Sequence, residues 1–354
     1  MDEVRAKEAA EAHGARCFAS TEELVGSDDV EMVINLTPPL AHGEVSMAVL
    51  GAGKHLYSEK PLGASRAEGR QIVAAAASAG LGLACAPDTF LGGGLQTSRR
   101  LVDSGVLGAP VAASAFLMGK GPEGSHPSPE FFFQRGAGPL FDVGPYYLTA
   151  LVHLLGPVDK VVASSKMGRS ERVVGKGPRA GSRFRVEVPT HVTGLVELDS
   201  GAVATLITSF DIWASELPRI EVYGTDGTLS VPDPNTFGGP VRLAERGRSG
   251  WTDVAVEGPY VEQSRGIGAA DLAAAVRDRR PPRAGGELAL HVLDVMESLI
   301  ESAESGSWVN VESTCERPVP LQSGLVDGEV GGWRRCRGRS RCSSTRCARQ
   351  PQPT

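Results

Sequence analysis

The chain has 354 residues, enough for two domains, and a net charge of −6 that is unevenly distributed. Hydrophobic residues make up 41% of the sequence, which is sufficient for a buried core. The sequence contains no run of 18 apolar residues, so no membrane span is predicted. The seven arginines of residues 331–354 have no acidic counterpart there, so the rest of the chain is strongly acidic. An acidic body argues against a nucleic-acid-binding protein, because phosphates would repel it.

The basic C-terminal tail, residues 324–354, is rich in Arg, Ser, Gln and Pro and lacks periodic apolar residues. Such a composition cannot build a core, so we expect the tail to be disordered. An arm that binds RNA or DNA is the alternative. The abrupt change of composition would also fit an out-of-frame end.

Six cysteines are present, and their spacing indicates neither disulfides nor a zinc site. They are Cys17, Cys85 and Cys315 in the body and Cys336, Cys342 and Cys347 in the tail. Singly scattered cysteines suit a reducing cytoplasm, and the tail contains no C-x-x-C pair that would favour zinc. Residues 1–20 lack the apolar stretch of a signal peptide, so the expected location is cytoplasmic.

The first part of the chain alternates helical and strand patterns. An Ala-, Glu- and Lys-rich stretch predicts a surface helix over 3–13, and Ser20 predicts the cap of a second, short helix. Short apolar runs predict strands at 31–36, 54–58, 81–86 and 111–118, and longer periodic stretches predict helices at 40–52, 65–79 and 93–106. Apolar strands that alternate with helices indicate a parallel sheet covered on both faces.

The second part has a different pattern. A Gly- and Pro-rich loop over 119–137 contains Phe131-Phe132-Phe133, which would either plug a domain junction or line a pocket. A helix over 142–154 follows. Alternating apolar and polar residues then predict strands at 158–165, 183–188, 191–198, 202–210, 218–224 and 227–231, followed by helices at 267–277 and 286–304. The predicted fold is therefore an α/β part followed by an α+β part with a mostly antiparallel open sheet.

A charged pair, Glu59-Lys60, stands at the end of the strand predicted at 54–58. Open α/β sheets bind ligands at the carboxyl ends of their strands, so this lysine could polarise a ligand while Glu59 holds it in place. Pro61 is expected to open the next helix, since a first-turn residue needs no N–H. An exposed ion pair is the alternative.

Two glycine patterns resemble phosphate-binding turns but have the wrong context. Gly119–Gly124 satisfies G-x-G-x-x-G, yet the following Ser125–Pro129 contains two prolines and cannot open a helix. Gly92-Gly93-Gly94 lacks the spacing. We therefore treat both as chance matches.

Three sequence blocks carry a family resemblance. The first contains Thr37-Pro38-Pro39, His42 and Glu59-Lys60-Pro61-Leu62, and the second is Gly138-Pro139-Leu140-Phe141-Asp142-Val143-Gly144-Pro145-Tyr146-Tyr147. The third is Gly224-Thr225-Asp226-Gly227-Thr228-Leu229. In this order they resemble the glucose-fructose oxidoreductase / inositol dehydrogenase / MocA family, over about residues 1–322.

The resemblance implies an oxidoreductase that uses NAD or NADP and acts on a sugar, cyclitol or related alcohol, as a homo-oligomer. It implies a dinucleotide-binding domain over 1–118 and a substrate and oligomerisation domain over 119–323. The implied catalytic residues are Lys60, Asp142 and Tyr146, the last at a position that is often histidine. The implied cofactor-binding residues are Thr37, Pro38, Pro39, His42, Glu59 and Lys60.

The chemistry of these side chains is consistent with that assignment. Oxidising an alcohol requires a group that takes the hydroxyl proton and a donor that stabilises the developing charge on oxygen. Tyrosine is a poor base at its ordinary pKa of about 10, and we expect Lys60 to lower the pKa of Tyr146. Asp142 and Tyr146 are spaced i, i+4 on the predicted helix, whereas Tyr147 would point into the core.

The start of the chain departs from the family pattern. Family members begin with a strand, a glycine-rich turn, a helix and a second strand, and we expect nearly all of this unit to be missing here, which leaves an incomplete Rossmann-type sheet. A misassigned start codon and a true truncation both explain this. The alternative function is a non-catalytic remnant that no longer binds a dinucleotide. The choice between NAD and NADP stays open.

Overall fold

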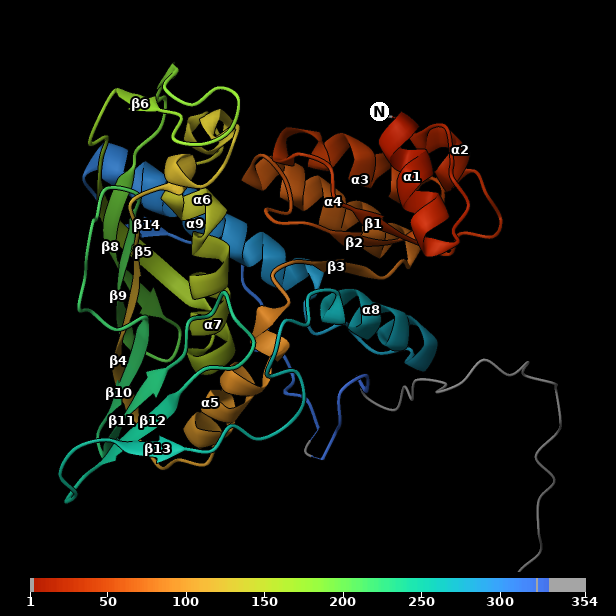
Figure 1. Ribbon diagram of the computed structural model, residues 1–354. Helices are drawn as coiled ribbons and strands as arrows, with labels where there is room; N and C mark the ends of the chain where they lie inside the picture. The colour runs from red at the N-terminus through yellow and green to blue at the C-terminus, as the bar shows by residue number, and fades with distance from the viewer. Residues whose placement is uncertain (1–2, 323, 331–354) are drawn as a thin grey trace, which may run out of the picture.

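The computed structural model describes residues 3–322 and 324–330, which form a small parallel sheet beside a large mixed sheet (Figure 1). The small sheet has the order β1-β2-β3, with strands Met32–Asn35, His55–Ser58 and Leu83–Cys85. Two helices, α1 (Glu3–His13) and α2 (Thr21–Val25), precede it. The predicted Rossmann-type parallel sheet is confirmed, with three strands in the described residues.

Helices cover both faces of the small sheet. On one face lie α3 (His42–Gly51) and α4 (Arg66–Ala79), and on the other lies α8 (Ile267–Asp278), which comes from the far end of the sequence (Figure 1). Residues 267–278 are thus part of this layer although they follow the large sheet in the chain. The α/β half is therefore completed by a late segment.

The start of α4 corrects one prediction. Pro61 does not open a helix, because α4 begins only at Arg66. Ser65 caps it by accepting a hydrogen bond from the Glu68 N–H at 3.2 Å, and the Glu68 carboxylate accepts one from the Ala64 N–H at 2.5 Å. This reciprocal capping satisfies N–H groups at the helix start and fixes that start at Arg66, six positions after Lys60.

The large sheet has nine strands in the order β13-β12-β11-β10-β4-β9-β8-β5-β14. In chain order they are β4 (Pro110–Met118), β5 (Val158–Lys166), β8 (His191–Leu198), β9 (Val203–Ser209), β10 (Ile220–Gly224), β11 (Gly227–Val231), β12 (Val241–Glu245), β13 (Thr252–Val254) and β14 (Val309–Asn310). Neighbouring strands are antiparallel except for β4 and β9, which run parallel. The expected mostly antiparallel sheet is confirmed.

Strand β4 lies between β10 and β9, near the middle of the large sheet. The division at residue 118 grouped this strand with the parallel sheet, and the structure places it elsewhere. The residue pattern of a short apolar strand is the same whether the strand belongs to the small sheet or to the large one. Only its pairing with strands distant in the sequence decides which sheet it joins. Strands β12, β13, β14 and β6 (Glu171–Val173) were not predicted, because all four are only two to five residues long. The strand predicted at 183–188 is present over Arg183–Arg185 as β7, and it pairs with β6 in a separate hairpin outside the large sheet.

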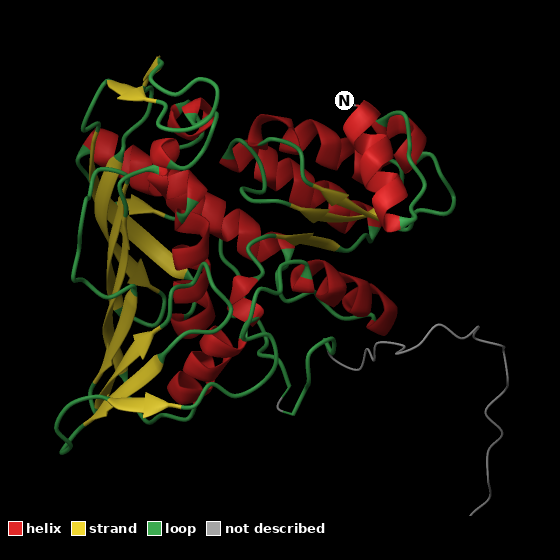
Figure 2. Cartoon of the chain, viewed as in Figure 1, coloured by secondary structure: helices red, strands yellow, loops and turns green. Residues whose placement is uncertain are grey.

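Three helices cover one face of the large sheet: α5 (Gly93–Asp103), α7 (Gly144–Leu155) and α9 (Gly286–Ser305) (Figure 2). Leu148, Leu151 and Val152 of α7 are fully buried in the resulting core. No described helix covers the opposite face of this sheet. Among the described residues, no helix has both the length and the apolar character needed to span a membrane.

The helix expected over 142–154 is broken at Val143 into α6 (Pro139–Asp142) and α7. Pro145 lacks the N–H that would bond to the Phe141 carbonyl, and Tyr146 instead donates to the Val143 carbonyl at 3.1 Å. Asp142 and Tyr146 therefore do not share one continuous helix. Asp142 ends α6, and Tyr146 lies in the first turn of α7.

The aromatic loop is divided between a core and a surface. Phe133 is fully buried and packs with Phe184 and Phe210 in a small core within the large-sheet part of the chain, so within the described residues it plugs no domain junction and lines no pocket. Phe131 is 47% exposed, because the turn Glu130–Phe133 directs successive side chains to different sides.

The described part of the predicted tail, residues 324–330, packs against the body. Tyr260 donates its hydroxyl to the Glu329 carbonyl at 2.9 Å, its backbone N–H donates to Asp327 at 2.7 Å, and Val330 is buried. The prediction that disorder begins at residue 324 is therefore wrong for these seven residues, because side chains of the body supply the partners that the tail lacks. The remainder, 331–354, lies outside the described residues.

Candidate active site

The carboxyl ends of the three parallel strands meet at one edge of the small sheet. The loops that follow them carry Thr37-Pro38-Pro39 after β1, Glu59-Lys60 after β2 and Pro87-Asp88 after β3. The start of α7 faces this edge from the large-sheet side, so two parts of the chain contribute side chains to one place (Figure 1).

Lys60 reaches across this junction to Asp142. Its Nζ lies 2.9 Å from Asp142 Oδ1 and 2.5 Å from the Asp142 carbonyl oxygen. The two side chains are 17% and 22% exposed. Burial acts to lower the pKa of Lys60, but Asp142 and Tyr146 outweigh it, so the pKa is raised and the ammonium is kept charged.

Glu59 does not pair with the ammonium of Lys60. Its carboxylate accepts a hydrogen bond from the Lys60 backbone N–H at 2.9 Å, and the ammonium pairs with Asp142 instead. The prediction that Glu59 holds the lysine in place is therefore wrong. The proposed alternative, an exposed ion pair of neighbouring residues, is not formed either.

Tyr146 lies beside Lys60, whose Nζ is 5.7 Å from the centre of the tyrosine ring. A second cation, Arg265, lies 5.6 Å from the same centre. Burial raises the pKa of Tyr146, and the opposing effects of Lys60 and Arg265 do not cancel that rise. The expected net lowering of this pKa is thus wrong, because the sequence pattern did not reveal the cost of desolvating a phenolate.

The neighbouring Tyr147 points away from this site. It is fully buried, and its hydroxyl makes no hydrogen bond within the described residues. Burial raises the pKa of Tyr147, followed by the charge of Asp233, while Arg219 opposes them without reaching hydrogen-bond geometry. The expectation that Tyr146 faces the site and Tyr147 the core agrees with this arrangement.

The loop after β1 is tied together by His42. One ring nitrogen of this buried histidine lies 2.7 Å from the Pro61 carbonyl and the other 2.8 Å from the Thr37 carbonyl. Because both nitrogens face backbone oxygens, His42 fixes the two strand-end loops relative to each other. Leu36 and Leu40, at the outside of the loop, are 68% and 75% exposed.

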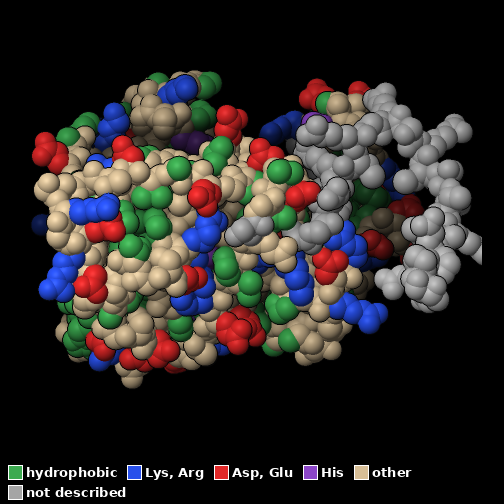
Figure 3. Space-filling model, turned by 90° about the horizontal axis from the view of Figure 1, so that it is seen from below, with side chains coloured by type: hydrophobic (Ala, Val, Ile, Leu, Met, Phe, Trp, Pro, Cys, Tyr) green, Lys and Arg blue, Asp and Glu red, His purple; other side chains and the backbone are tan. Residues whose placement is uncertain are grey.

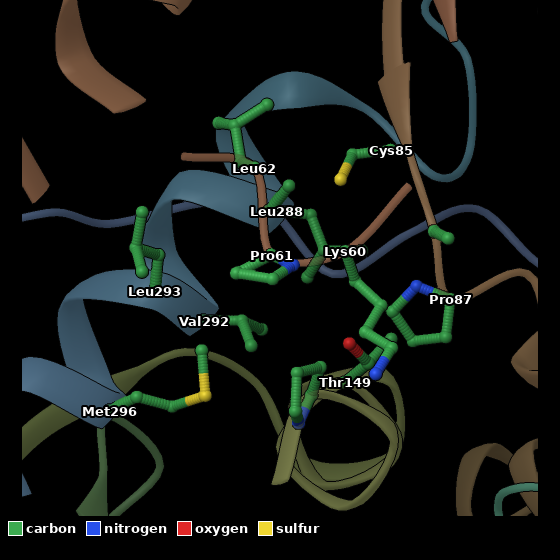
Figure 4. A pocket seen from close by; sticks show the side chains of 13 residues that line it. Lys60, Pro61, Leu62, Cys85, Pro87, Thr149, Leu288, Val292, Leu293 and Met296 are labelled. Carbon is green, nitrogen blue, oxygen red and sulfur yellow. The ribbon is translucent and has the colours of Figure 1, made fainter. Parts of the chain in front are cut away.

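A small, mostly apolar pocket lies behind Lys60, between the strand ends and helices α7 and α9. Its lining side chains include Pro61, Leu62, Cys85, Thr149, Val292 and Met296. Figure 4 shows Lys60 passing between Pro87 and Thr149 with its nitrogen directed toward α7. Apolar walls keep water from the ammonium and strengthen its electrostatic interactions.

Neither glycine pattern forms a phosphate-binding turn. Gly119–Gly124 leads into the single 3₁₀ turn Pro122–Gly124, as expected for a chance match. Gly92 and Gly94 open α5, but a Cβ on either would lie 2.4 Å from a backbone oxygen of Phe237 or Gly238. These glycines are required for close packing of the chain against itself.

The described residues contain no group of His, Cys, Asp or Glu side chains suited to a metal ion. On the face seen in Figure 3, acidic and basic side chains are interspersed and do not gather by sign. Arg265 and Thr149 belong to the candidate site although the sequence analysis did not predict them, since no motif surrounds either one.

Two family models match this chain. Residues 1–86 match the oxidoreductase family with an NAD-binding Rossmann fold, and residues 95–230 match the GFO/IDH/MocA C-terminal domain. The chain belongs to the Gfo/Idh/MocA oxidoreductase family. The N-terminal model matches from the first residue, so the expected truncation is not shown.

Curated relatives and solved structures agree with this membership. 1,5-Anhydro-D-fructose reductase of Ensifer adhaerens is 29% identical over 60% of this chain, which spans only 60% of that relative. D-xylose 1-dehydrogenase (NADP(+)) 2 of Haloferax volcanii is 28% identical over 88% of this chain and 90% of its own length. The crystal structure of an NAD binding oxidoreductase from Klebsiella pneumoniae is 25% identical, with a TM-score of 0.76 over 88% of both chains.

Proposed function

We propose that this protein oxidises a hydroxyl group of a sugar, cyclitol or related polyol with NAD or NADP, or catalyses the reverse reduction. The observation that carries the proposal is the position of Lys60. Its ammonium is paired with Asp142, lies beside the ring of Tyr146 and stands at the carboxyl edge of the parallel sheet. The names of two relatives, a sugar reductase and an NADP-dependent sugar dehydrogenase, support the substrate class.

The residues around the strand ends fit the nicotinamide half of such a cofactor. Leu36 and Leu40, in the loop after β1, are exposed and offer an apolar surface at the strand ends. Thr37, Pro38, Pro39 and Glu59 would hold the cofactor, while His42 positions their loops. When bound, the nicotinamide ring accepts or supplies the hydride.

Lys60 is proposed to donate a hydrogen bond to the substrate oxygen and to stabilise negative charge on it as the C–H bond breaks or forms. Asp142 keeps this ammonium charged and directed, through both its carboxylate and its carbonyl oxygen. Tyr146 is proposed to carry the hydroxyl proton. Because burial raises its pKa, Tyr146 is protonated at neutral pH and is suited to act as the acid during carbonyl reduction.

The same proposal includes a homo-oligomer formed through the uncovered face of the large sheet. Phe116 of β4 pairs in register with Ile207 of β9, and Leu195 of β8 pairs with Val162 of β5. Leu195 and Ile207 lie between buried residues along their strands, as expected for side chains on the outer face. Leu195 is 39% exposed. A second copy would cover these apolar side chains, whose exposure is otherwise unfavourable.

This part of the proposal is tested by the mass of the protein in solution. Leu195→Glu should shift the protein to monomers in light scattering, whereas Val173→Glu, on the exposed hairpin β6–β7, should not. A wild-type monomer at micromolar concentration would contradict the homo-oligomer without affecting the proposed chemistry.

The alternative is a protein that binds no dinucleotide, because no glycine turn that could hold a pyrophosphate occurs in the described residues. NADH and NADPH binding by fluorescence, followed by rates with a panel of sugars and inositols, decides between the two. We expect binding and turnover, with Lys60→Met lowering kcat at least about 100-fold and Lys166→Met, an exposed control, unchanged. Absence of both binding and turnover in the wild type would establish the alternative.

A further inference from the structure

Arg265 lies at the mouth of the candidate site. It belongs to the loop that leads into α8, is exposed, and places its guanidinium 5.6 Å from the centre of the Tyr146 ring. Lys60 approaches the same ring at 5.7 Å. Two cations therefore surround the residue that carries the proton in the proposed reaction.

The two cations differ in their partners. The Lys60 ammonium is paired with the Asp142 carboxylate. Within the described residues, Arg265 donates hydrogen bonds only to Asn235, at 2.7 Å to its side-chain oxygen and 3.3 Å to its carbonyl. Both oxygens are uncharged. No carboxylate in the described part of the chain comes within ion-pair distance of Arg265.

Asp88 is the acid whose charge Arg265 influences, but it is engaged elsewhere. Its Oδ2 accepts hydrogen bonds from the backbone N–H groups of Gly266 and Gly268, at 2.8 and 3.0 Å, at the start of α8. Burial raises the pKa of Asp88, and these hydrogen bonds together with Arg265 oppose that rise. Asp88 thus stabilises the helix start and leaves the guanidinium without a direct anionic partner.

We propose that Arg265 binds an anionic group of the substrate, a carboxylate or a phosphate, and that the preferred substrate is therefore an anionic sugar or polyol. This inference rests on the proposed oxidoreductase function. A guanidinium binds both kinds of anion through parallel N–H donors, and such charge-assisted bonds are stronger than those to neutral oxygens. The hydroxyl to be oxidised then lies at Lys60 and Tyr146, and the anion lies at Arg265.

Asn235 acts as a positioning residue for this contact. Its side-chain oxygen accepts a hydrogen bond from one NH₂ group of the Arg265 guanidinium and so orients the remaining N–H donors of that guanidinium. Arg265 is exposed and joins no core, so its removal is not expected to unfold the protein. The proposal can therefore be tested by substitution.

The test uses sugars that differ only at C6: D-glucose, D-glucuronate and D-glucose 6-phosphate, with the corresponding galactose series. Binding to the cofactor-loaded protein is measured by calorimetry, and kcat and KM are measured with NAD and NADP. We expect an anionic member to bind at least tenfold more tightly than its neutral parent, and the member that binds identifies carboxylate or phosphate as the source. Raising the salt concentration should weaken only this binding.

Arg265→Gln should raise KM and the dissociation constant for the anionic sugars about 10- to 100-fold and change those for neutral sugars less than about threefold. Asn235→Ala should have a smaller effect of the same kind, and Arg265→Lys should retain part of the preference. Arg246→Gln, on the β12–β13 hairpin, is the control and should behave as wild type.

Three outcomes would overturn the inference. An equal loss for neutral and anionic sugars in Arg265→Gln would show that Arg265 acts through Tyr146. An unchanged preference in that variant would show that the anion binds elsewhere. A wild type that binds and oxidises neutral sugars as well as anionic ones would refute the anionic substrate class but leave the oxidoreductase function standing.

Discussion

The adjacent residues Tyr146 and Tyr147 provide the sharpest test of the site, because the same chemical change should have opposite consequences at the two positions. Each is replaced by phenylalanine, which removes one hydroxyl and preserves the ring. Lys60 and Arg265 lie 5.7 and 5.6 Å from the centre of the Tyr146 ring, whereas Tyr147 is fully buried and its hydroxyl has no hydrogen-bond partner in the described residues.

The expected magnitudes follow from these surroundings. Loss of a general acid or base lowers kcat by about 10²–10⁴, so Tyr146→Phe should lower kcat at least about 100-fold. The described structure gives the Tyr146 hydroxyl no hydrogen-bond partner in the protein, so stability should change little. In Tyr147→Phe, kcat should stay within a few-fold of wild type.

Stability provides the second half of the comparison. A buried hydroxyl without a partner costs about 1–3 kcal/mol of desolvation, and part of that cost is recovered when phenylalanine replaces Tyr147. The free energy of unfolding should be unchanged or rise by about 1 kcal/mol, which corresponds to a rise in Tm of roughly 2–4 °C for domains of about 150–250 residues.

The assay combines single-turnover kinetics on the best substrate with thermal unfolding of the same preparations. A Tyr146→Phe variant near the wild-type rate, with an inactive Tyr147→Phe variant, would show that the wrong face of α7 was assigned to the site. A fall of several degrees in the Tm of Tyr147→Phe would show that Arg219 does bond to the buried hydroxyl.

Three further predictions concern charge, packing and pH. Asp142→Asn removes the anion that outweighs burial at Lys60, so the pKa of Lys60 should fall and the high-pH limb of kcat should move to lower pH; an unmoved limb would contradict the assigned pairing. Gly224→Ala would place a Cβ 2.1 Å from the Leu107 carbonyl oxygen and should lower Tm by many degrees, whereas Gly51→Ala, with open space around it, should leave Tm unchanged or slightly raised. Burial, followed by the charges of Arg99 and Arg317, lowers the pKa of His153. Below about pH 6.5 the unfolded state therefore binds a proton that the folded state does not bind. The free energy of unfolding should then fall, as the pH is lowered, by up to about 1.4 kcal/mol per pH unit. In His153→Gln this pH dependence should be reduced, as measured by denaturant unfolding between pH 5 and about 7.

Much of the local structure could be predicted from the sequence, because neighbouring residues decide it. Ser20 caps its helix through the backbone N–H of Glu23, as the spacing predicted. The three parallel strands were recognised as short apolar runs between turn residues. The family resemblance of the surrounding sequence blocks implied Lys60, Asp142 and Tyr146 as catalytic candidates, and their catalytic roles remain predictions.

The tertiary structure alone decided which of these residues act on one another. Lys60 pairs with Asp142, 82 positions away, and not with the adjacent Glu59, because the fold brings α6 to the strand ends. Strand β4 belongs to the large sheet because it pairs on one edge with β9 and on the other with β10, both about a hundred residues later in the chain.

Burial likewise could not be obtained from the pattern of residue types. The pKa of Tyr146 is raised and not lowered, because removing water from the phenol outweighs two nearby cations. Arg265 lies at the site because α8, which follows it in the chain, packs against the small sheet. No local sequence motif predicts this position. Sequence determined the residues and their local elements, whereas long-range packing determined their charge states and partners, since desolvation and ion pairing depend on groups that the chain brings together only when folded.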